Sequence, residues 1–268
     1  WFSALSTVKA NRIMFTVETI EIDKDFFECW RSAAQHITGM FGKEPVNWFR
    51  LELPTTIEHF SFYHGSNLFF VDICDIDQPQ TSRVPKKRFE VLVEEADGIG
   101  CFMPMKKIGA HWKPVNSAWG LQDHDTGSAI IPEDLIKTEM YSISPWEEHT
   151  LGLNISKVKL IQDGWEIMSL QSDRAVYPDI IGTKDGQLCG VIVRSSRTST
   201  LAGERPKNSQ HIAEMIRSKG MVPKFIGLTI ADQNHSIFDP EFSHLKEIMC
   251  RGGITICKPF EIEDLVLH

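Results

Sequence analysis

The side chains best suited to chemistry lie in the second half of the chain, where basic residues outnumber acidic ones. Residues 184–224 carry eight basic and three acidic side chains, a local balance of +5, although the whole chain has a formal net charge of −8. Arginine and lysine bind phosphate oxygens. The residues that we expect to contact nucleic acid are Arg197, Arg205 and Lys207. Two alternatives stay open: the basic residues form a solvated face, or they bind an acidic protein segment.

A proline–aspartate pair and an arginine lie in two neighbouring apolar runs of this region. Pro178-Asp179 stands in the run 177–183, and Arg194 stands near the end of the run 188–195. Both runs have the composition and the flanking turn residues of β-strands, and a short turn joins them into a hairpin. Because side chains alternate between the two faces of a strand, Ile192 and Arg194 share one face, and Arg194 can point towards Asp179.

The elements around this hairpin follow a regular order. A helix that begins at Pro145 and ends before Gly164 precedes three strands, and a second helix that ends at Gly220 precedes a fourth strand. The stripe that we expect the first helix to bury comprises Leu151, Ile155, Val158 and Ile161. The order helix–strand–strand–strand–helix–strand is predicted over residues 145–162, 165–170, 177–183, 188–195, 207–219 and 223–230. A further helix near 240–250 and a strand near 254–257 are predicted to follow.

This order, together with Pro178-Asp179, resembles the restriction-endonuclease-like, PD-(D/E)xK, nuclease superfamily over about residues 146–230. The resemblance implies an αβββαβ core in which a strand aspartate, and an acid two residues before a lysine, hold Mg²⁺ or Mn²⁺. Carried over to this chain, Asp179 is the strand aspartate and Arg194 takes the place of the lysine. Glu148 on the first helix is implied as a second metal ligand beside Asp179.

One position departs from the pattern of the superfamily. Ile192 stands where the second catalytic acid belongs, and isoleucine offers no oxygen to a divalent cation. Some members move that acid to the following helix, where Glu214 can take its role. The substitution leaves open whether the chain is a metal-dependent nuclease with altered chemistry or a nuclease-like protein that only binds nucleic acid. The alternative is a non-enzymatic interaction module that reuses the fold for a protein partner.

The first half of the chain predicts a separate α+β domain of unassigned role. A helix is expected from about Asp25 to Met40, and strands are expected at 48–53, 59–63 and 67–74. Residues 88–94 and 99–105 flank Ala96-Asp97-Gly98 and predict a β-hairpin. The turn-rich segment that follows predicts a domain boundary near residue 143, which divides the chain into domains 1–143 and 144–268.

The other polar clusters predict ordinary surface structure. Asp72, Asp75 and Asp77 are expected at the end of a strand and in its solvated exit turn, and Asp123-His124-Asp125 are expected in a loop. The histidines and the six cysteines lack the spacing of a zinc site, and we find no internal repeat. No apolar run approaches the ~20 residues of a membrane span. We therefore expect a cytoplasmic protein with reduced thiols and no membrane contact.

Overall fold

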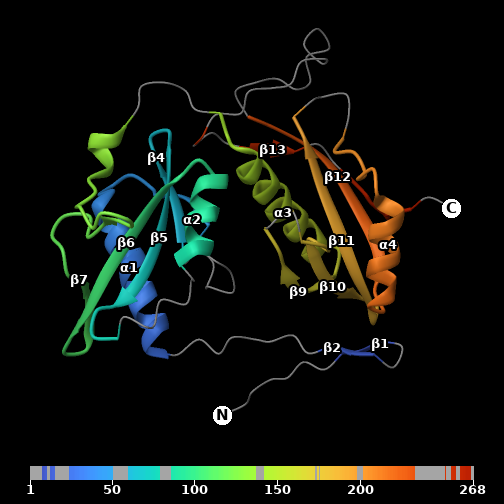
Figure 1. The fold of residues 1–268 in the computed structure, drawn as a ribbon, viewed down its shortest axis with the longest axis horizontal. Coiled ribbons are helices and arrows are strands. Elements are labelled where there is room, and N and C mark those ends of the chain that lie inside the picture. The colour runs from blue at the N-terminus through green and yellow to red at the C-terminus, as the bar shows by residue number, and fades with distance from the viewer. Residues whose placement is uncertain are drawn as a thin grey trace, which may run out of the picture. The chain divides into compact units, whose positions relative to one another are not determined.

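The chain has a mixed α+β fold with two large β-sheets, shown in Figure 1. The computed structural model describes residues 8–10, 13–15, 24–50, 60–78, 86–136, 142–172, 174, 176–197, 202–232, 251, 255–257 and 260–266. Contacts divide the chain into two compact units. We call residues 19–142 with 250–252 the N-terminal unit, and residues 143–249 and 253–268 with 1–18 the C-terminal unit. Strands β1 (Val8–Ala10) and β2 (Ile13–Phe15) form a small antiparallel pair.

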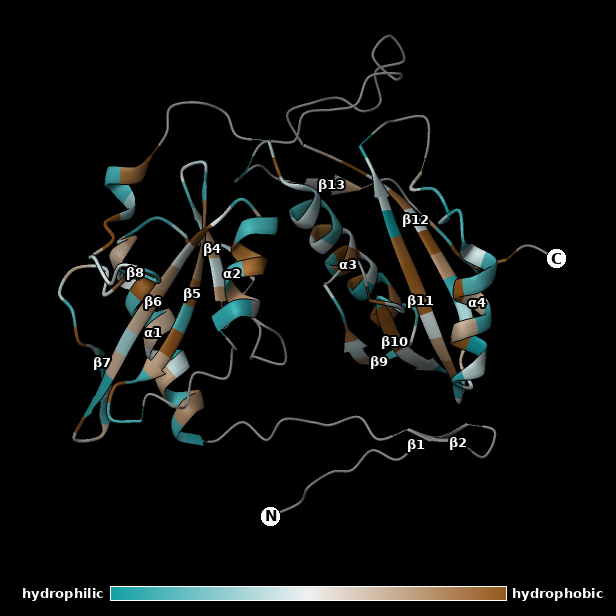
Figure 2. Cartoon of the chain, in the orientation of Figure 1, coloured by the Kyte–Doolittle hydropathy of each residue, from teal (hydrophilic) through white to brown (hydrophobic). Residues whose placement is uncertain are grey.

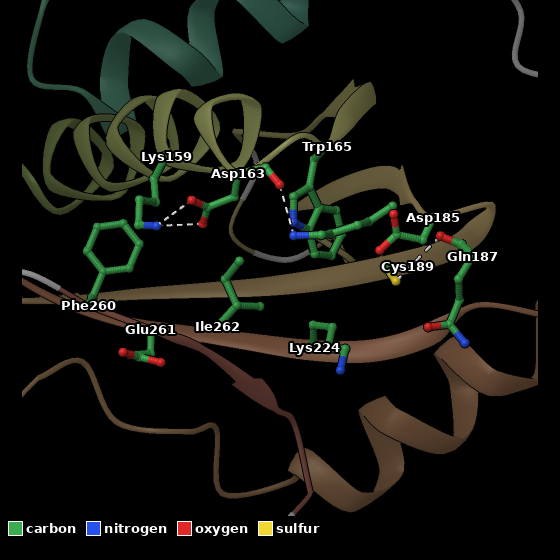
Figure 3. A pocket seen from close by; sticks show the side chains of 11 residues that line it. Lys159, Asp163, Trp165, Asp185, Gln187, Cys189, Lys224, Phe260, Glu261 and Ile262 are labelled. Atoms are coloured by element: carbon green, nitrogen blue, oxygen red, sulfur yellow. Dashed lines mark hydrogen bonds and ion pairs between the residues drawn. The ribbon is translucent and has the colours of Figure 1, made fainter.

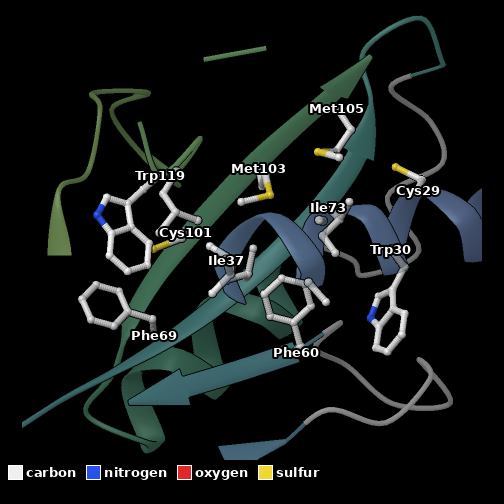
Figure 4. Close-up of a cluster of buried hydrophobic side chains, with 14 of the residues drawn as sticks. Cys29, Trp30, Ile37, Phe60, Phe69, Ile73, Cys101, Met103, Met105 and Trp119 are labelled. Carbon is white, nitrogen blue, oxygen red and sulfur yellow. The ribbon is translucent and has the colours of Figure 1, made fainter. Parts of the chain in front are cut away.

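The N-terminal unit is built on a sheet with the strand order β3-β4-β5-β6-β7. Helix α1 packs on one face of this sheet, where its Trp30 and Ile37 join a buried cluster with Phe60 and Phe69 (Figure 4). The elements are α1 (Lys24–Met40), β3 (Asn47–Arg50), β4 (Phe60–His64), β5 (Asn67–Asp75), α2 (Lys86–Glu95), β6 (Ile99–Ile108), β7 (His111–Pro114), β8 (Gln122–Asp123) and the 3₁₀ helix η2 (Pro132–Leu135). The helix predicted to end near Met40 and the strands predicted at 48–53, 59–63, 67–74 and 99–105 are confirmed as far as the described residues reach.

Helix α2 corrects the expected hairpin over 88–94 and 99–105. The run Phe89–Val93 alternates like a strand, but Phe89, Leu92 and Ala96 also lie at helical spacing, and all three are buried. Tertiary structure decides between the two patterns, because β5 and β6 pair in parallel. A parallel pair needs a crossover connection, and α2 supplies it. Asp97, in the left-handed region with φ of 50°, ends the helix.

The C-terminal unit contains a sheet with the strand order β9-β10-β11-β12-β13. Helices α3 and α4 pack on its opposite faces (Figure 1): Leu160 of α3 clusters with Val191 and Val193, whereas Ile216 of α4 clusters with Ile192. Figure 2 shows hydrophobic residues along β11 and β12, the strands covered on both faces. The elements are α3 (Pro145–Gln162), β9 (Glu166–Leu170), β10 (Ile180–Lys184), β11 (Gln187–Ser196), α4 (Ser209–Ser218), β12 (Val222–Asp232), β13 (Thr255–Cys257) and β14 (Ile262–Asp264). The predicted order of helices and strands is confirmed, and the helix expected near 240–250 lies outside the described residues.

The buried face of α3 matches the predicted stripe only in part, since Leu151 and Ile155 pack against the core cluster but the other two residues do not. Val158 and Ile161 are 55% and 52% exposed. The residues that α3 buries are instead Trp146, Glu147, His149, Thr150, Gly152, Leu153, Ser156 and Leu160. Gly152 faces the sheet, where an added Cβ would make an ordinary van der Waals contact of 3.5 Å with Ser195 Cβ. The helix therefore turns a polar face, which includes His149, towards the strands.

The two large sheets share one connectivity. In each unit a helix precedes three antiparallel strands, and a second helix leads to a fourth strand that is parallel to the third. The central hairpins also share their register, because Phe60 pairs with Val71 as Ile180 pairs with Val191, 120 residues further along the chain.

The correspondence extends to the irregular positions. Both first strands carry a bulge at the same place, where the pairing skips Phe49 in β3 and Met168 in β9. The expectation of no internal repeat is therefore wrong at the level of backbone pairing. The two units share few residue types, so only the structure reveals the repeat.

Among the described residues, no helix is both long enough and apolar enough to cross a lipid bilayer.

Candidate functional site

The buried carboxylate of Asp179 is the centre of the candidate site. Asp179 directly precedes β10 and is fully buried. Its Oδ2 accepts a 2.7 Å hydrogen bond from the Val193 backbone N–H and a 3.0 Å hydrogen bond from Arg194 Nη1. The structure thus brings Asp179 and Arg194 together across the β10–β11 hairpin. The expected shared face is not observed, because Ile192, which shares the face of Arg194, packs on α4, whereas Asp179 faces His149 of α3.

Arg194 is held by more than its ion pair. Its guanidinium donates hydrogen bonds to the Val193 carbonyl and, over 3.2 Å, to the Tyr177 hydroxyl. It also lies 5.5 Å from the centre of the Tyr177 ring, a cation–π distance. The side chain of Arg194 is only 20% exposed, so its contacts are mainly with residues of the same unit. Tyr177 was not among the predicted site residues, although it directly precedes Pro178-Asp179.

Burial controls the ionisation of Asp179. It raises the pKa of the carboxyl to about 6, while the charge of Arg194 and the Val193 N–H lower the pKa without cancelling the effect of burial. The carboxylate is therefore ionised and paired with Arg194 at neutral pH.

His149 on α3 faces the other oxygen of the same carboxylate. His149 Nε2 lies 3.9 Å from Asp179 Oδ1, and both side chains are at least 95% buried. Within the described part of the chain, Asp179 Oδ1 accepts no hydrogen bond. His149 was not predicted as a site residue, because the predicted stripe of α3 did not include its buried polar residues. The signal that the sequence offered was that His149 directly follows the predicted ligand Glu148.

The start of α3 fixes where Glu148 and His149 point. Ser144 caps the helix: its Oγ accepts a hydrogen bond from the Glu147 N–H, and Glu147 Oε2 accepts one from the Ser144 N–H. Glu148 Oε2 lies 2.9 Å from Arg197 Nε, and Glu148 Oε1 accepts a 3.2 Å hydrogen bond from Ser195 Oγ. The predicted metal ligand Glu148 and the predicted nucleic-acid contact Arg197 thus form an ion pair with each other.

The other predicted residues lie away from Asp179. Glu214 is exposed on α4 and accepts a hydrogen bond from Gln210, while the opposite side of α4 packs on the sheet. Arg205 pairs with Glu263 and lies 4.8 Å from the Phe225 ring centre. Lys207 is exposed.

Ile192 packs as an ordinary core residue. It is fully buried and packs with Ile212 and Ile216 of α4. The position of the second catalytic acid is therefore part of the apolar core. Of the residues that the structure describes, Glu90, His124 and Asp125 of the N-terminal unit form the group that brings three potential metal ligands together. The Asp179–Arg194 site does not form such a group.

A pocket of about 770 Å³ opens at the other end of the hairpin from Asp179 (Figure 3). Lys159 pairs with Asp163 there, Lys184 donates to the Asp163 carbonyl, and Lys224 pairs with Asp264. The pocket contains none of the predicted site residues.

The comparisons with known proteins name no activity. A family described as a domain of unknown function (DUF8840) matches residues 146–252 of this chain. No curated protein matches the chain, and no solved structure does.

Proposed function

We propose that the C-terminal unit is a divergent restriction-endonuclease-like domain that binds nucleic acid without metal-dependent cleavage. The αβββαβ order, the parallel β11–β12 pair and the Asp179–Arg194 contact support the resemblance to the superfamily. The proposed absence of cleavage is supported by the hydrogen bonds of Asp179. Its Oδ2 is occupied by Arg194 and the Val193 N–H, and the neighbouring acid position is a buried isoleucine.

The basic residues that support binding differ from those expected. Arg197 and Arg205 form ion pairs with Glu148 and Glu263. They are therefore less suited to bind phosphate. Lys207, Arg217 and Lys219 are exposed on and beside α4. We propose that these three residues contact the phosphate backbone.

A titration with labelled DNA and RNA tests this proposal. We expect an affinity that falls as salt rises, and that weakens when Lys207, Arg217 and Lys219 are together replaced by alanine. Replacement of the exposed Lys43, Lys87 and Lys113 of the N-terminal unit is the matched charge control and should leave the affinity largely intact. An equal loss of binding in both triple variants would contradict the assignment of the phosphate contacts to Lys207, Arg217 and Lys219.

A cleavage assay tests the other half of the proposal. Incubation with DNA or RNA and Mg²⁺ or Mn²⁺ should give no products with the wild type or with Asp179→Ala. Cleavage by the wild type that Asp179→Ala abolishes would instead establish a metal-dependent nuclease.

One observation favours a protein partner as the second candidate. Val158 and Ile161 are exposed apolar side chains on neighbouring turns of α3, whereas Leu151 and Ile155 of the same helix pack against the core cluster. Exposed apolar patches occur at protein interfaces. Two results together would favour a protein partner: the protein does not bind nucleic acid, and the double variant Val158→Ser/Ile161→Ser no longer binds a protein that the wild type binds.

A further inference from the structure

The N-terminal unit buries a carboxylate where the C-terminal unit buries an apolar residue. Asp72 and Ile192 stand one residue after Val71 and Val191, which hold the same register position in the two hairpins. Ile192 is fully buried, and Asp72 is only 4% exposed. A buried carboxylate is costly unless a specific partner stabilises it, so the surroundings of Asp72 indicate what its charge serves.

His124 is the ring that faces Asp72. Its Nε2 lies 3.9 Å from Asp72 Oδ2, and its ring stacks on Phe89 of α2 with 4.6 Å between ring centroids. Its backbone N–H donates to the Gly100 carbonyl. The backbone of His124 is therefore fixed, and its ring packs on Phe89 with one nitrogen 3.9 Å from a buried acid.

The turn after His124 is pinned by Asp123. Asp123 Oδ1 accepts hydrogen bonds from the Asp125 N–H, the Thr126 N–H and the Thr126 hydroxyl. These bonds hold Asp125 beside the imidazole, and Asp125 Oδ1 lies 3.9 Å from His124 Nδ1. Nδ1 itself is buried and makes no hydrogen bond within the described residues.

Glu90 of α2 completes a group of three. One ligand atom from each of Glu90, His124 and Asp125 lies within 4.8 Å of the other two, and the three side chains line a pocket of about 310 Å³. An imidazole oriented by a carboxylate on its far nitrogen is the arrangement by which proteins fix a histidine for a metal. Asp72 Oδ2 lies 3.9 Å from the far nitrogen of His124, which is an ion-pair separation and not a hydrogen bond, so Asp72 acts on the imidazole through its charge.

We propose that the N-terminal unit binds a divalent transition-metal ion through Glu90, His124 and Asp125, with Asp72 positioning His124. One nitrogen and two carboxylate oxygens suit a borderline cation such as Zn²⁺ or Co²⁺ better than Mg²⁺, which prefers oxygen ligands alone. Three protein ligands leave further coordination positions for water or a substrate. The site is separate from the Asp179 carboxylate and does not depend on the function proposed for the C-terminal unit.

Lys86 competes with the ion. Its Nζ lies 3.6 Å from both Glu90 Oε1 and Asp125 Oδ1, so an ammonium group already offsets part of the negative charge of the two carboxylates. The lysine side chain is 63% exposed, and such surface pairs are weak. The ion therefore displaces Lys86 into solvent, and removal of this competing charge strengthens binding.

Calorimetry with Zn²⁺ and absorption spectroscopy with Co²⁺ test the proposal on the whole chain. We expect one ion per chain, loss of that ion in His124→Ala, and a roughly 10- to 100-fold weaker affinity in Asp72→Asn. Lys86→Gln should bind the ion several-fold more tightly. His111→Ala, which removes an exposed histidine of β7, is the matched control and should bind like the wild type.

Thermal unfolding of each variant separates loss of the site from loss of the fold. Asp125 is 73% exposed, so Asp125→Asn removes a ligand without disturbing the core and should also weaken binding. No stoichiometric binding by the wild type, or equal binding by the wild type, His124→Ala and Asp125→Asn, would overturn the proposal.

Discussion

Arg194 donates a 3.0 Å hydrogen bond to the fully buried carboxylate of Asp179. This contact joins the two residues around which a nuclease-like site would be built. Together with the Val193 N–H it occupies Oδ2, whereas Oδ1 accepts no hydrogen bond from the described residues. A residue that looks catalytic in the sequence is thus part of the internal stabilisation of the hairpin end.

Arg194→Ala should destabilise the protein by about 3–5 kcal/mol, because it leaves a buried carboxylate without its counter-charge. Asp179→Asn/Arg194→Ala together should recover part of that loss, since the buried charge is then absent. Urea unfolding of the single and double variants measures the coupling. A change below about 1 kcal/mol for Arg194→Ala would show that the ion pair is not a structural contact.

Asp179 should make stability depend on pH in acid. The pKa of a free aspartate is near 3.8 and burial raises it to about 6, so the folded state holds the proton more tightly than the unfolded state. The stability that the protonated Asp179 contributes to the folded state is fully present below pH 4 and is lost as pH rises towards 6. Relative to Asp179→Asn, the wild type should lose roughly 3 kcal/mol over this range and then change little. Parallel profiles for the two proteins would contradict the raised pKa.

The Glu148–Arg197 pair should couple more strongly than a surface pair. Both side chains are at most 15% exposed, whereas Lys159 and Asp163 are 39% and 30% exposed. A double-mutant cycle with Glu148→Gln and Arg197→Met should give about 1–3 kcal/mol, against about 0–1 kcal/mol for the Lys159–Asp163 cycle. Equal coupling in the two cycles would mean that burial does not strengthen the inner pair.

Gly203→Ala should be strongly destabilising, because the new Cβ would lie 2.0 Å from the Arg194 carbonyl oxygen. The loop before α4 or the end of β11 would have to move, and with it Arg194. Gly39→Ala is the contrasting change, since a Cβ there meets no atom within 4 Å and the residue lies inside α1. It should stabilise the protein by up to about 1 kcal/mol. Thermal unfolding compares the two variants.

The order of elements in the C-terminal unit could be predicted from the sequence because turns and caps mark it clearly. Pro145, Gly164 and Gly220 stand at helix ends, and Asp185-Gly186 forms the turn of the hairpin with both φ angles positive. The closeness of Asp179 and Arg194 was expected from their places in neighbouring strands and is observed. These features depend on neighbours in the chain, which a sequence displays directly.

Features set by distant packing could not be predicted in the same way. Residues 86–95 suit a strand or a helix, and only the parallel pairing of β5 with β6 decides for the helix. The apolar stripe of α3 gave no hint that Gly152 and Ser156 would face the sheet and bring His149 to Asp179. His124 and Asp72 lie far apart in the sequence, so their approach is likewise a property of the fold.

The mixed pairing within each sheet has a consequence for how the chain folds. Two-residue loops join β4 to β5 and β10 to β11, so these hairpins close small loops and can form within microseconds. Strands β6 and β12 reach their parallel neighbours only after a helix has crossed over, which delays those contacts. In each unit we expect the hairpin to be protected from hydrogen exchange before the parallel strand docks. The hairpin that carries Asp179 and Arg194 would then form early, and β12, which pairs with β11, would join it later.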